Sequence, residues 1–514
     1  MNNRTAGWRP DGRQMARYAL LSLVSLGAIG VGDVILRYTY SLYLSFQPGV
    51  FLQEGHLLLL AVAGFAALGG WVDRLDRAER WSARAVRALL LTLVFVALFQ
   101  VFRQSLATSL PLPGWAKAGA MAACAMAAAG VAWRGRVEVG ERLGNAACLA
   151  LVTLFALQPG MAGFLLKAAS GTTHASKASD THATPGPRRT VVIVFDEWDM
   201  EVSEREGLFS QAPMQRLLAQ SFFAERALPA GPNTLESIPG MLFAQPFGEI
   251  DRGGAAELRS KTGQAWTPDS QQLFSDLQSR HVSHAVVGYY HDYCALVTTA
   301  RRCHAEPVQF FQGWKAQFQR AFKRTGELDF PYSVFLKQWH ATYARLHEEA
   351  LRAVEDRDND MVWIHINVPH PPSAVGRHAP SNLLNDYRVN LVLTAELIDA
   401  VQQRLVAQGG ESTLVLTSDH WLREHELWAA MYEQQRGAGS GKAGKTPDHR
   451  VPFIVWFSKA DTAVRHAPTI STLATRPLVL GLLSGEVNNP QAVADFFRKQ
   501  PAAVPPRSGG AGVH

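Results

Sequence analysis

Five long apolar runs fill the first 168 residues and constrain the fold of this 514-residue chain more than any other feature. They lie at about residues 17–36, 52–72, 86–102, 114–133 and 145–167. Each is close to the ~20 residues that an α-helix needs to cross a bilayer. The first is too long, and too closely followed by the others, to be a cleaved signal peptide. We therefore predict a transmembrane domain of five helices over residues 1–168.

The basic residues between these runs are distributed asymmetrically. The N-terminal segment and the loops after the second and fourth runs are rich in arginine, whereas the alternate loops carry few basic residues. Because positive charge stays on the cytoplasmic side, we predict a cytoplasmic N-terminus. An odd number of spans then places the rest of the chain on the outer face of the membrane. The arginines on the cytoplasmic side are Arg4, Arg9, Arg13, Arg17, Arg74, Arg77, Arg80, Arg84, Arg87, Arg134, Arg136 and Arg142.

The formal net charge of +6 at pH 7 follows from this topology, since much of the arginine excess lies in the cytoplasmic loops. It therefore does not indicate nucleic-acid binding. Beyond the apolar runs, residues 169–189 are small, polar and rich in proline and glycine, which is typical of a linker. We expect a soluble domain over residues 190–499 and a disordered tail over residues 500–514.

The soluble part alternates between apolar strands and amphipathic helices. Continuous apolar runs of this length are typical of strands buried on both faces of a parallel sheet. Alternating strands and helices favour an α/β sandwich with a mostly parallel central sheet. The predicted strands cover residues 190–195, 285–288, 361–368, 413–417 and 452–457, and the predicted helices cover residues 213–225, 270–280, 333–354 and 385–407.

Two of the predicted strands end in side chains that can bind a metal ion. Asp196 and Glu197 follow the first strand, and Asp419 and His420 follow the fourth. Carboxylate and imidazole groups are ligands for divalent cations, and sites in open α/β sheets gather at the carboxyl ends of the strands. We therefore predict a single metal site from these four residues. The alternative for Asp196 and Glu197 is a helix cap or a solvated turn.

Thr234 stands in the segment Gly231-Pro-Asn-Thr-Leu-Glu-Ser-Ile-Pro239, which has the composition of a helix start. A hydroxyl beside a metal ion can ionise and attack phosphorus, and the N–H groups of a helix N-terminus favour an anionic substrate. The alternative is that Thr234 or Ser237 only caps the helix.

The histidines fall into two groups. His365 lies within a predicted strand, where a buried core histidine is as good an interpretation as a functional one. His370 stands in a rigid Pro-His-Pro-Pro segment and is a candidate to hold a phosphoryl oxygen or protonate a leaving group. His449 precedes the last strand and is a candidate second metal ligand or phosphate contact. We expect the remaining three of interest, His291, His304 and His425, to be surface residues.

Two cysteines of the soluble domain, Cys294 and Cys303, lie nine positions apart. In an oxidising compartment they can form a disulfide that closes a small loop. Spacing alone does not prove this pairing.

Taken in order, these motifs resemble the membrane-bound transferases of the alkaline phosphatase/sulfatase superfamily, which include phosphoethanolamine transferases and lipoteichoic acid synthases. The resemblance covers most of residues 189–460, and the predicted spans match the membrane part of those enzymes. It implies a multi-pass protein of a bacterial inner membrane with its catalytic domain in the periplasm. It implies that Thr234 is the nucleophile and also a metal ligand, and that the bound divalent metal is zinc, with manganese as the alternative. It implies Asp196, Glu197, Asp419 and His420 as the other ligands, and Asn233, His365, His370 and His449 as substrate contacts, with His370 also catalytic.

The sequence departs from that pattern at two points. Trp421 replaces the glycine that usually follows Asp-His, which would narrow the pocket. The Cys/Ser-x-Pro-x-Arg segment that sulfatases convert to formylglycine does not stand where Thr234 is, which argues against sulfate ester hydrolysis.

The resemblance implies transfer of a phospho-alcohol group, of the phosphoethanolamine or phosphoglycerol type, through a phospho-threonine. The donor would be a membrane phospholipid and the acceptor an envelope lipid or glycan. Two alternatives remain open from the sequence. One is a hydrolase that uses the same residues with water as the acceptor. The other is a non-catalytic sulfatase-like binding protein, for which Trp421 is the argument.

Overall fold

The computed structural model describes residues 188–252, 255–307, 332–376, 383–422 and 449–500, together with the single residues 19 and 63. Apart from those two single residues, the five predicted spans lie outside this part of the chain, as do the predicted linker up to residue 187 and the tail from residue 501. Among the described residues, no helix has both the length and the apolar character needed to cross a bilayer.

Strand β1 (Arg188–Asp196) lies in the middle of a mixed nine-stranded sheet with the order β10-β2-β9-β8-β1-β7-β5-β6, in which β11 also pairs with β2. Strand β9 is antiparallel to β2 and β8, and the other neighbouring strands are parallel. The mostly parallel sheet predicted from the sequence is therefore confirmed. The remaining strands are β2 (Ser221–Leu228), β5 (His284–Tyr290), β6 (Arg302–Pro307), β7 (Met361–Pro369), β8 (Glu411–Ser418), β9 (Val451–Phe457), β10 (Val464–His466) and β11 (Ile470–Ser471).

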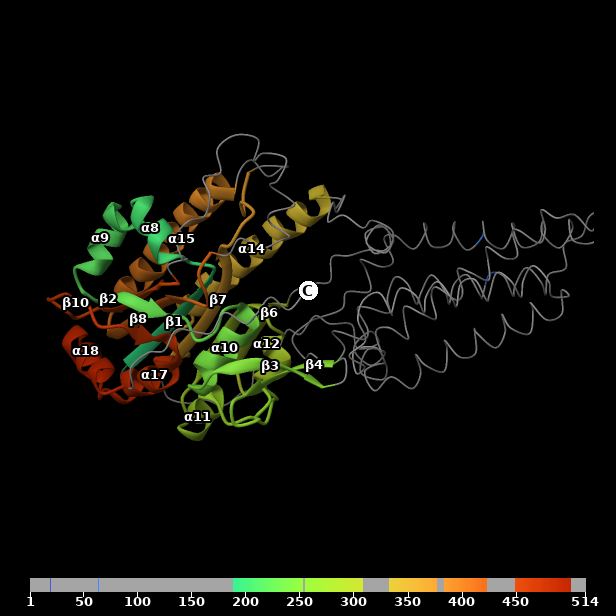
Figure 1. Ribbon diagram of the computed structural model, residues 1–514. Helices are drawn as coiled ribbons and strands as arrows, with labels where there is room; N and C mark the ends of the chain where they lie inside the picture. The colour runs from blue at the N-terminus through green and yellow to red at the C-terminus, as the bar shows by residue number, and fades with distance from the viewer. Residues whose placement is uncertain are drawn as a thin grey trace, which may run out of the picture.

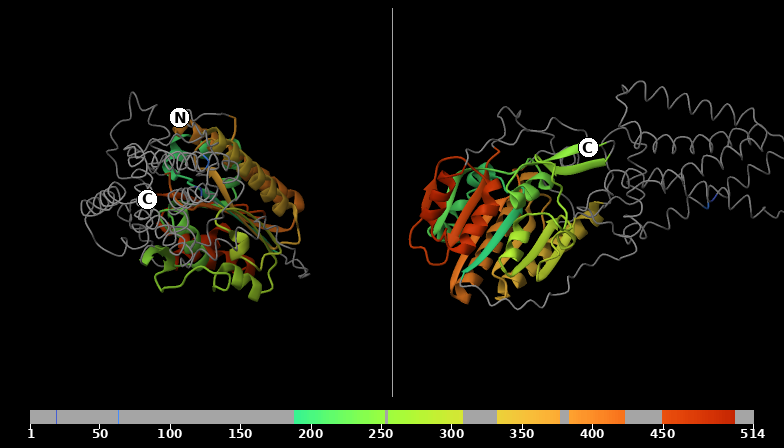
Figure 2. Two further views of the ribbon diagram at one scale, coloured as in Figure 1. Left: turned by 90° about the vertical axis from the view of Figure 1, so that its right-hand side faces the viewer. Right: turned by 90° about the horizontal axis from the view of Figure 1, so that it is seen from below.

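Helices cover both faces of this sheet (Figures 1 and 2). Successive side chains of β1 point to opposite faces, so Val192 and Val194 belong to one hydrophobic core and Val191 and Ile193 to the other. The first core is covered by α10 (Thr234–Phe243), α11 (Leu273–Ser279), α17 (Thr475–Ser484) and α18 (Pro490–Arg498), and the second by α8 (Met200–Arg205), α9 (Ala212–Leu218), α14 (Tyr332–Glu355) and α15 (Leu383–Gln408).

A separate two-stranded antiparallel sheet is formed by β3 (Phe247–Arg252) and β4 (Ala255–Ser260). A single-turn helix, α12 (Tyr293–Leu296), lies between β5 and β6. Two short 3₁₀ helices, η1 (Leu208–Ser210) and η3 (Thr472–Ala474), complete the described elements.

All five predicted strands are present as β1, β5, β7, β8 and β9, and three of the predicted helices match α11, α14 and α15. The helix predicted over residues 213–225 is wrong in its second half, because α9 ends at Leu218 and β2 begins at Ser221. The reason lies in the adjacent pair Phe222 and Phe223, which pack into the two opposite cores. Neighbouring residues reach opposite sides of a strand but not of a helix.

Candidate metal centre and nucleophile

The carboxyl ends of β1, β8 and β7 bring the predicted ligands to one edge of the sheet. Phe195 is paired with Ser418, so Asp419 continues directly beside Asp196, and its N–H donates to the Phe195 carbonyl at 3.1 Å. On the other side, the register between β1 and β7 shifts after Phe195. This shift lets the N–H of His370 donate to the Asp196 carbonyl at 3.0 Å.

Asp196, Asp419 and His420 form a compact donor set. Each offers one ligand atom, these atoms all lie within 4.8 Å of one another, and the three side chains are buried. Glu197 is also fully buried beside them, and its backbone has a φ of 59°, a left-handed conformation that is uncommon for a residue other than glycine. The alternative of a cap or a solvated turn is wrong for Asp196 and Glu197, because Asp199 caps α8 and both acids are buried.

A divalent cation fits this donor set. Ionised carboxylates are costly to bury unless positive charge compensates them, and here three acidic side chains are 0–2% exposed at one point. The imidazole of His420 and oxygens from carboxylates are a common zinc or manganese combination. The structure thus brings together Asp196, Asp419 and His420, and it places Glu197 next to them with its Oε1 3.9 Å from His420 Nδ1.

The hydrogen bonds of His420 define which ring nitrogen faces the donor set. Its Nδ1 lies 2.9 Å from the carbonyl oxygen of Trp421, which can only accept, so Nδ1 carries the proton. Nε2 then presents its lone pair toward Asp419 Oδ2 at 3.4 Å and Asp196 Oδ1 at 3.7 Å. A ring held by a backbone carbonyl in this way is oriented for metal binding.

Thr234 is the first residue of α10, and its hydroxyl belongs to the same cluster. Oγ1 donates to Asp419 Oδ2 at 2.7 Å and lies 3.2 Å from His420 Nε2. The helix cap is Asn233, whose side chain accepts from the N–H of Glu236 at 2.9 Å. The alternative that Thr234 or Ser237 merely caps the helix is therefore wrong. Asn233, expected to contact substrate, has its side-chain oxygen engaged in this cap.

The start of α10 is attached directly to the end of β8. Ser237 Oγ donates to the carbonyl oxygen of Asp419 and accepts from the N–H of Gly231 at 3.2 Å. A Cβ at Gly231 would lie 2.7 Å from Glu236 Cβ, so the turn before α10 requires glycine. These contacts keep Thr234 and Asp419 in register although 185 positions separate them in the chain.

The two oxygens of Asp419 have different partners. Oδ1 accepts from the backbone N–H of Glu197 at 3.0 Å and of His420 at 2.7 Å, whereas Oδ2 accepts from Thr234. The two backbone bonds hold the carboxylate plane. Oδ2 is consequently directed at the hydroxyl of Thr234 and at His420.

The other predicted histidines occupy three different positions around this cluster. His370 Nε2 lies 3.9 Å from Glu197 Oε2, and its side chain is 16% exposed. His365 is fully buried, with Nδ1 3.0 Å from the hydroxyl of Tyr293 and Nε2 4.0 Å from Asp419 Oδ2. His449 stacks on Trp421, with ring centroids 4.0 Å apart.

The prediction that His291 is a surface residue is wrong. His291 is fully buried, and its Nε2 lies 3.2 Å from the carbonyl oxygen of Thr234. Burial lowers the pKa of His291 to about 3, so the ring is neutral. His304 is partly buried and lies 3.2 Å from Glu306. His425 lies outside the described residues.

The signal for His291 was present in the sequence. Residues 289–293, Tyr-Tyr-His-Asp-Tyr, follow a predicted apolar strand, as Asp196 and Asp419 follow theirs. The same rule that placed those acids at the carboxyl edge of the sheet places His291 there too.

No protein-family model matches the chain, and no curated protein sequence does so either. Among solved structures, the integral membrane protein lipooligosaccharide phosphoethanolamine transferase A from Neisseria meningitidis is 15% identical, with a TM-score of 0.34 over 91% of this chain and 95% of that chain. A protein in the alkaline phosphatase superfamily from Vibrio parahaemolyticus is 10% identical, with a TM-score of 0.37 over 64% of this chain and 76% of that chain. The lipoteichoic acid synthase of Listeria monocytogenes is 11% identical, with a TM-score of 0.33 over 60% of this chain and 76% of that chain. The chain is similar to these proteins.

Chemically, the cluster combines a buried hydroxyl, a carboxylate that accepts its hydrogen bond and a donor set that could hold a cation. The Thr234 hydroxyl is buried and directed at a carboxylate, and it stands where the N–H groups of α10 favour negative charge. This is the arrangement that in-line displacement at an anionic phosphoryl centre needs.

Proposed function

We propose that this protein is a metal-dependent phosphotransferase with Thr234 as its nucleophile. It transfers a phospho-alcohol group from a membrane phospholipid to an envelope lipid or glycan. One observation supports this most strongly: Thr234 Oγ1 lies between Asp419 Oδ2 and His420 Nε2, at 2.7 and 3.2 Å, in a cluster of buried acids. A threonine with a purely structural role has no need of that position.

In the first step, the Thr234 hydroxyl passes its proton to Asp419 Oδ2, and Oγ1 attacks the phosphorus of the phosphodiester. The bond between phosphorus and the glycerol oxygen of the diacylglycerol breaks, and that oxygen takes a proton from His370, the partly exposed histidine of the site. The products are diacylglycerol and a Thr234 phosphodiester. The first turn of α10 stabilises the charge on the phosphoryl oxygens through its N–H groups.

In the second step, an acceptor hydroxyl loses its proton to His370 and attacks the same phosphorus. The bond from phosphorus to Oγ1 breaks, and the proton held on Asp419 returns to Thr234. The residues that would hold the metal ion are Asp196, Asp419 and His420, with Glu197 and Thr234 adjacent. Zinc or manganese bound there would supply positive charge that lowers the pKa of the hydroxyl and polarises the phosphoryl group.

The choice of a lipid donor follows from the predicted membrane spans of residues 1–168. A site tethered to the periplasmic face of a bacterial inner membrane has phospholipid headgroups at high local concentration. We propose that location and the phosphoethanolamine- or phosphoglycerol-type group on this ground, together with the order of the sequence motifs.

The test uses the full chain in detergent with zinc or manganese and with headgroup-labelled phosphatidylethanolamine or phosphatidylglycerol. We expect the wild type to release diacylglycerol and the Thr234→Ala variant to release none above background. Thr475→Ala is a matched control, because Thr475 is also a buried first residue of a helix, but its hydroxyl bonds within its own turn. If the wild type released diacylglycerol and all of the label were recovered as the free phospho-alcohol, water would be the acceptor and the protein would be a hydrolase. Equal release by Thr234→Ala would contradict the proposal.

A further inference from the structure

We propose that His291 and Tyr293 are positioning residues that hold the two ends of the Thr234–Asp419 hydrogen bond. Both belong to a segment, residues 289–293, that follows β5 and begins α12. The inference rests on the proposed function, since it concerns how the nucleophile is aligned. It adds contacts from the end of β5 to a site otherwise built from β1, β7, β8 and α10.

His291 holds Thr234 through the backbone carbonyl of Thr234. The ring is fully buried, and its Nε2 donates to the carbonyl oxygen of Thr234, because that oxygen can only accept. It packs on Trp266 with ring centroids 5.2 Å apart. The first residue of α10 is therefore fixed at two points, through its hydroxyl by Asp419 and through its carbonyl by His291.

Tyr293 orients the ring of His365, which packs against the acid. Its hydroxyl lies 3.0 Å from Nδ1 of His365, and Nε2 of the same ring lies 4.0 Å from Asp419 Oδ2. The ring of His365 is oriented by the hydrogen bond between its Nδ1 and the Tyr293 hydroxyl, and among the described residues its Nε2 makes no hydrogen bond but packs against Asp419. Tyr293 and His365 are both buried, which excludes water from this side of Asp419.

The strand β5 is shaped to admit the ring of Tyr293. A Cβ at Gly288 would lie 2.0 Å from Tyr293 Cδ2, a distance that no side chain could tolerate. Tyr290, at the end of the strand, has a φ of 72°, which is strained for a bulky residue. Strain of this kind persists where the surrounding structure imposes it and is found mostly at functional sites.

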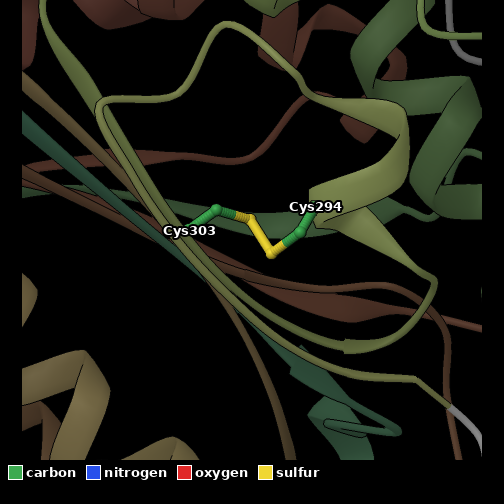
Figure 3. The surroundings of a disulfide bond; sticks show 2 residues. All are labelled: Cys294 and Cys303. Carbon is green, nitrogen blue, oxygen red and sulfur yellow. A yellow bond between two sulfur atoms is a disulfide. The ribbon is translucent and has the colours of Figure 1, made fainter. Parts of the chain in front are cut away.

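The segment is fixed to the sheet immediately after Tyr293. Cys294, the next residue, forms a disulfide with Cys303 of β6 (Figure 3). Two tight backbone bonds, from His291 N–H to the Tyr289 carbonyl at 2.9 Å and from Tyr293 N–H to the His291 carbonyl at 2.8 Å, keep the turn closed. The two contacts to the site thus come from one rigid turn.

A comparison along β5 separates positioning from ordinary core packing. His284, at the opposite end of the strand, is also buried, and its two ring nitrogens lie 3.0 Å from the Val282 carbonyl and from Thr299 Oγ1. It contacts no residue of the proposed cluster. His284 is therefore the matched control for His291.

The experiment measures kcat and KM of the full-length protein in detergent, with bis(p-nitrophenyl) phosphate as the probe. It also measures bound metal and the thermal midpoint of each variant. We expect His291→Leu to lower kcat by about 10- to 100-fold, as for other residues that orient a site, while KM stays within about twofold. His291→Gln restores an N–H donor to the Thr234 carbonyl and should recover most of the loss. His284→Leu should lower the thermal midpoint and leave kcat unchanged.

Tyr293→Phe provides a second, nearly isosteric variant that removes only the hydroxyl. We expect it to lower kcat with metal content unchanged, whereas Tyr343→Phe, a buried tyrosine of α14, should not. Wild-type kcat in both His291→Leu and Tyr293→Phe would overturn the inference. So would a kcat loss in His291→Gln as large as in His291→Leu at equal thermal midpoints. If the wild type turned over the probe without forming an adduct on Thr234, that result would instead overturn the proposed function.

Discussion

The two edges of the central sheet differ in the exposure and the partners of their charged side chains. At the amino edge, charged residues meet guanidinium partners near solvent: Arg188 pairs with Glu411 at 2.8 Å, with side chains 33% and 57% exposed, and Arg301 pairs with Asp356 and Asp358. At the carboxyl edge, three acids are buried, and the ion-pair contacts described for them are with imidazoles. One strand, β1, contributes to both edges.

The difference shows which charges the fold needs and which the site needs. An exposed ion pair costs little to form and contributes little to stability. A cluster of buried acids lowers stability unless a cation neutralises it. The buried acids of the carboxyl edge therefore lower the stability of the fold where the proposed chemistry takes place. The amino edge of the same sheet provides the comparison.

The largest expected effect is at Asp196. Asp196→Asn should lower the proposed transferase activity by about 100-fold or more, because it removes one donor of the proposed metal set. The metal-free variant should be at least as stable as the metal-free wild type, since it buries one charge less. Diacylglycerol release, elemental analysis and thermal denaturation in a chelator would check this. A metal-free variant that is clearly less stable would show that the carboxylate is structural.

The next largest effect concerns the disulfide between Cys294 and Cys303 beside the site. Replacing both Cys294 and Cys303 by alanine should lower the free energy of unfolding by about 2–4 kcal/mol. It should also lower kcat at a temperature where the variant is fully folded, because the turn that carries His291 and Tyr293 loses its attachment. Chemical denaturation and steady-state kinetics measure the two effects. Unchanged kcat in the folded variant would confine the disulfide to a stabilising role.

A smaller effect is expected for His284, at the amino end of β5. Burial lowers the pKa of His284 below its ordinary value of 6.5, so only the unfolded state binds this proton as the pH falls below 6.5. The contribution of neutral His284 is complete above that pH and declines below it, by at most about 1.4 kcal/mol per pH unit. His284→Gln should flatten the stability profile below pH 6.5 relative to the wild type. Parallel profiles would refute the assignment.

The smallest effect is at the amino edge. Arg188→Gln breaks the exposed pair with Glu411 and should change the free energy of unfolding by about 0–1 kcal/mol. Activity should not change. A loss of several kcal/mol in denaturant unfolding would mean that the two edges do not differ as described.

Strands β1, β5, β7, β8 and β9 were predictable because each contains a continuous apolar run long enough to be buried on both faces. The acids and histidine after β1 and β8 were predictable for the same reason, since strand ends in a parallel sheet converge. Strand β2 was not predictable, because its apolar pair Phe222–Phe223 is too short to reveal a period. The hydrogen bond between Thr234 and Asp419 depends on the order of the strands in the sheet, which only the structure shows.

The strand-end rule places His291 at the carboxyl edge, but the sequence does not show what His291 and Tyr293 contact. Each acts through a contact with another chain segment, one with α10 and the other with β7. No spacing rule relates residues 293 and 365, because the pairing of β5 with β7 brings them together. The contacts of Trp421 were also not predictable from the sequence. Its ring stacks on His449, and its carbonyl orients His420.

The most direct test of the account is peptide mass spectrometry of Thr234 after incubation of the purified wild type with headgroup-labelled phospholipid and metal. We predict a phospho-alcohol adduct on Thr234 whose mass identifies the transferred group, absent in Thr234→Ala and retained in Thr475→Ala. Phospholipid turnover with no adduct on Thr234 in rapidly quenched samples, or with the adduct on another residue, would contradict the account.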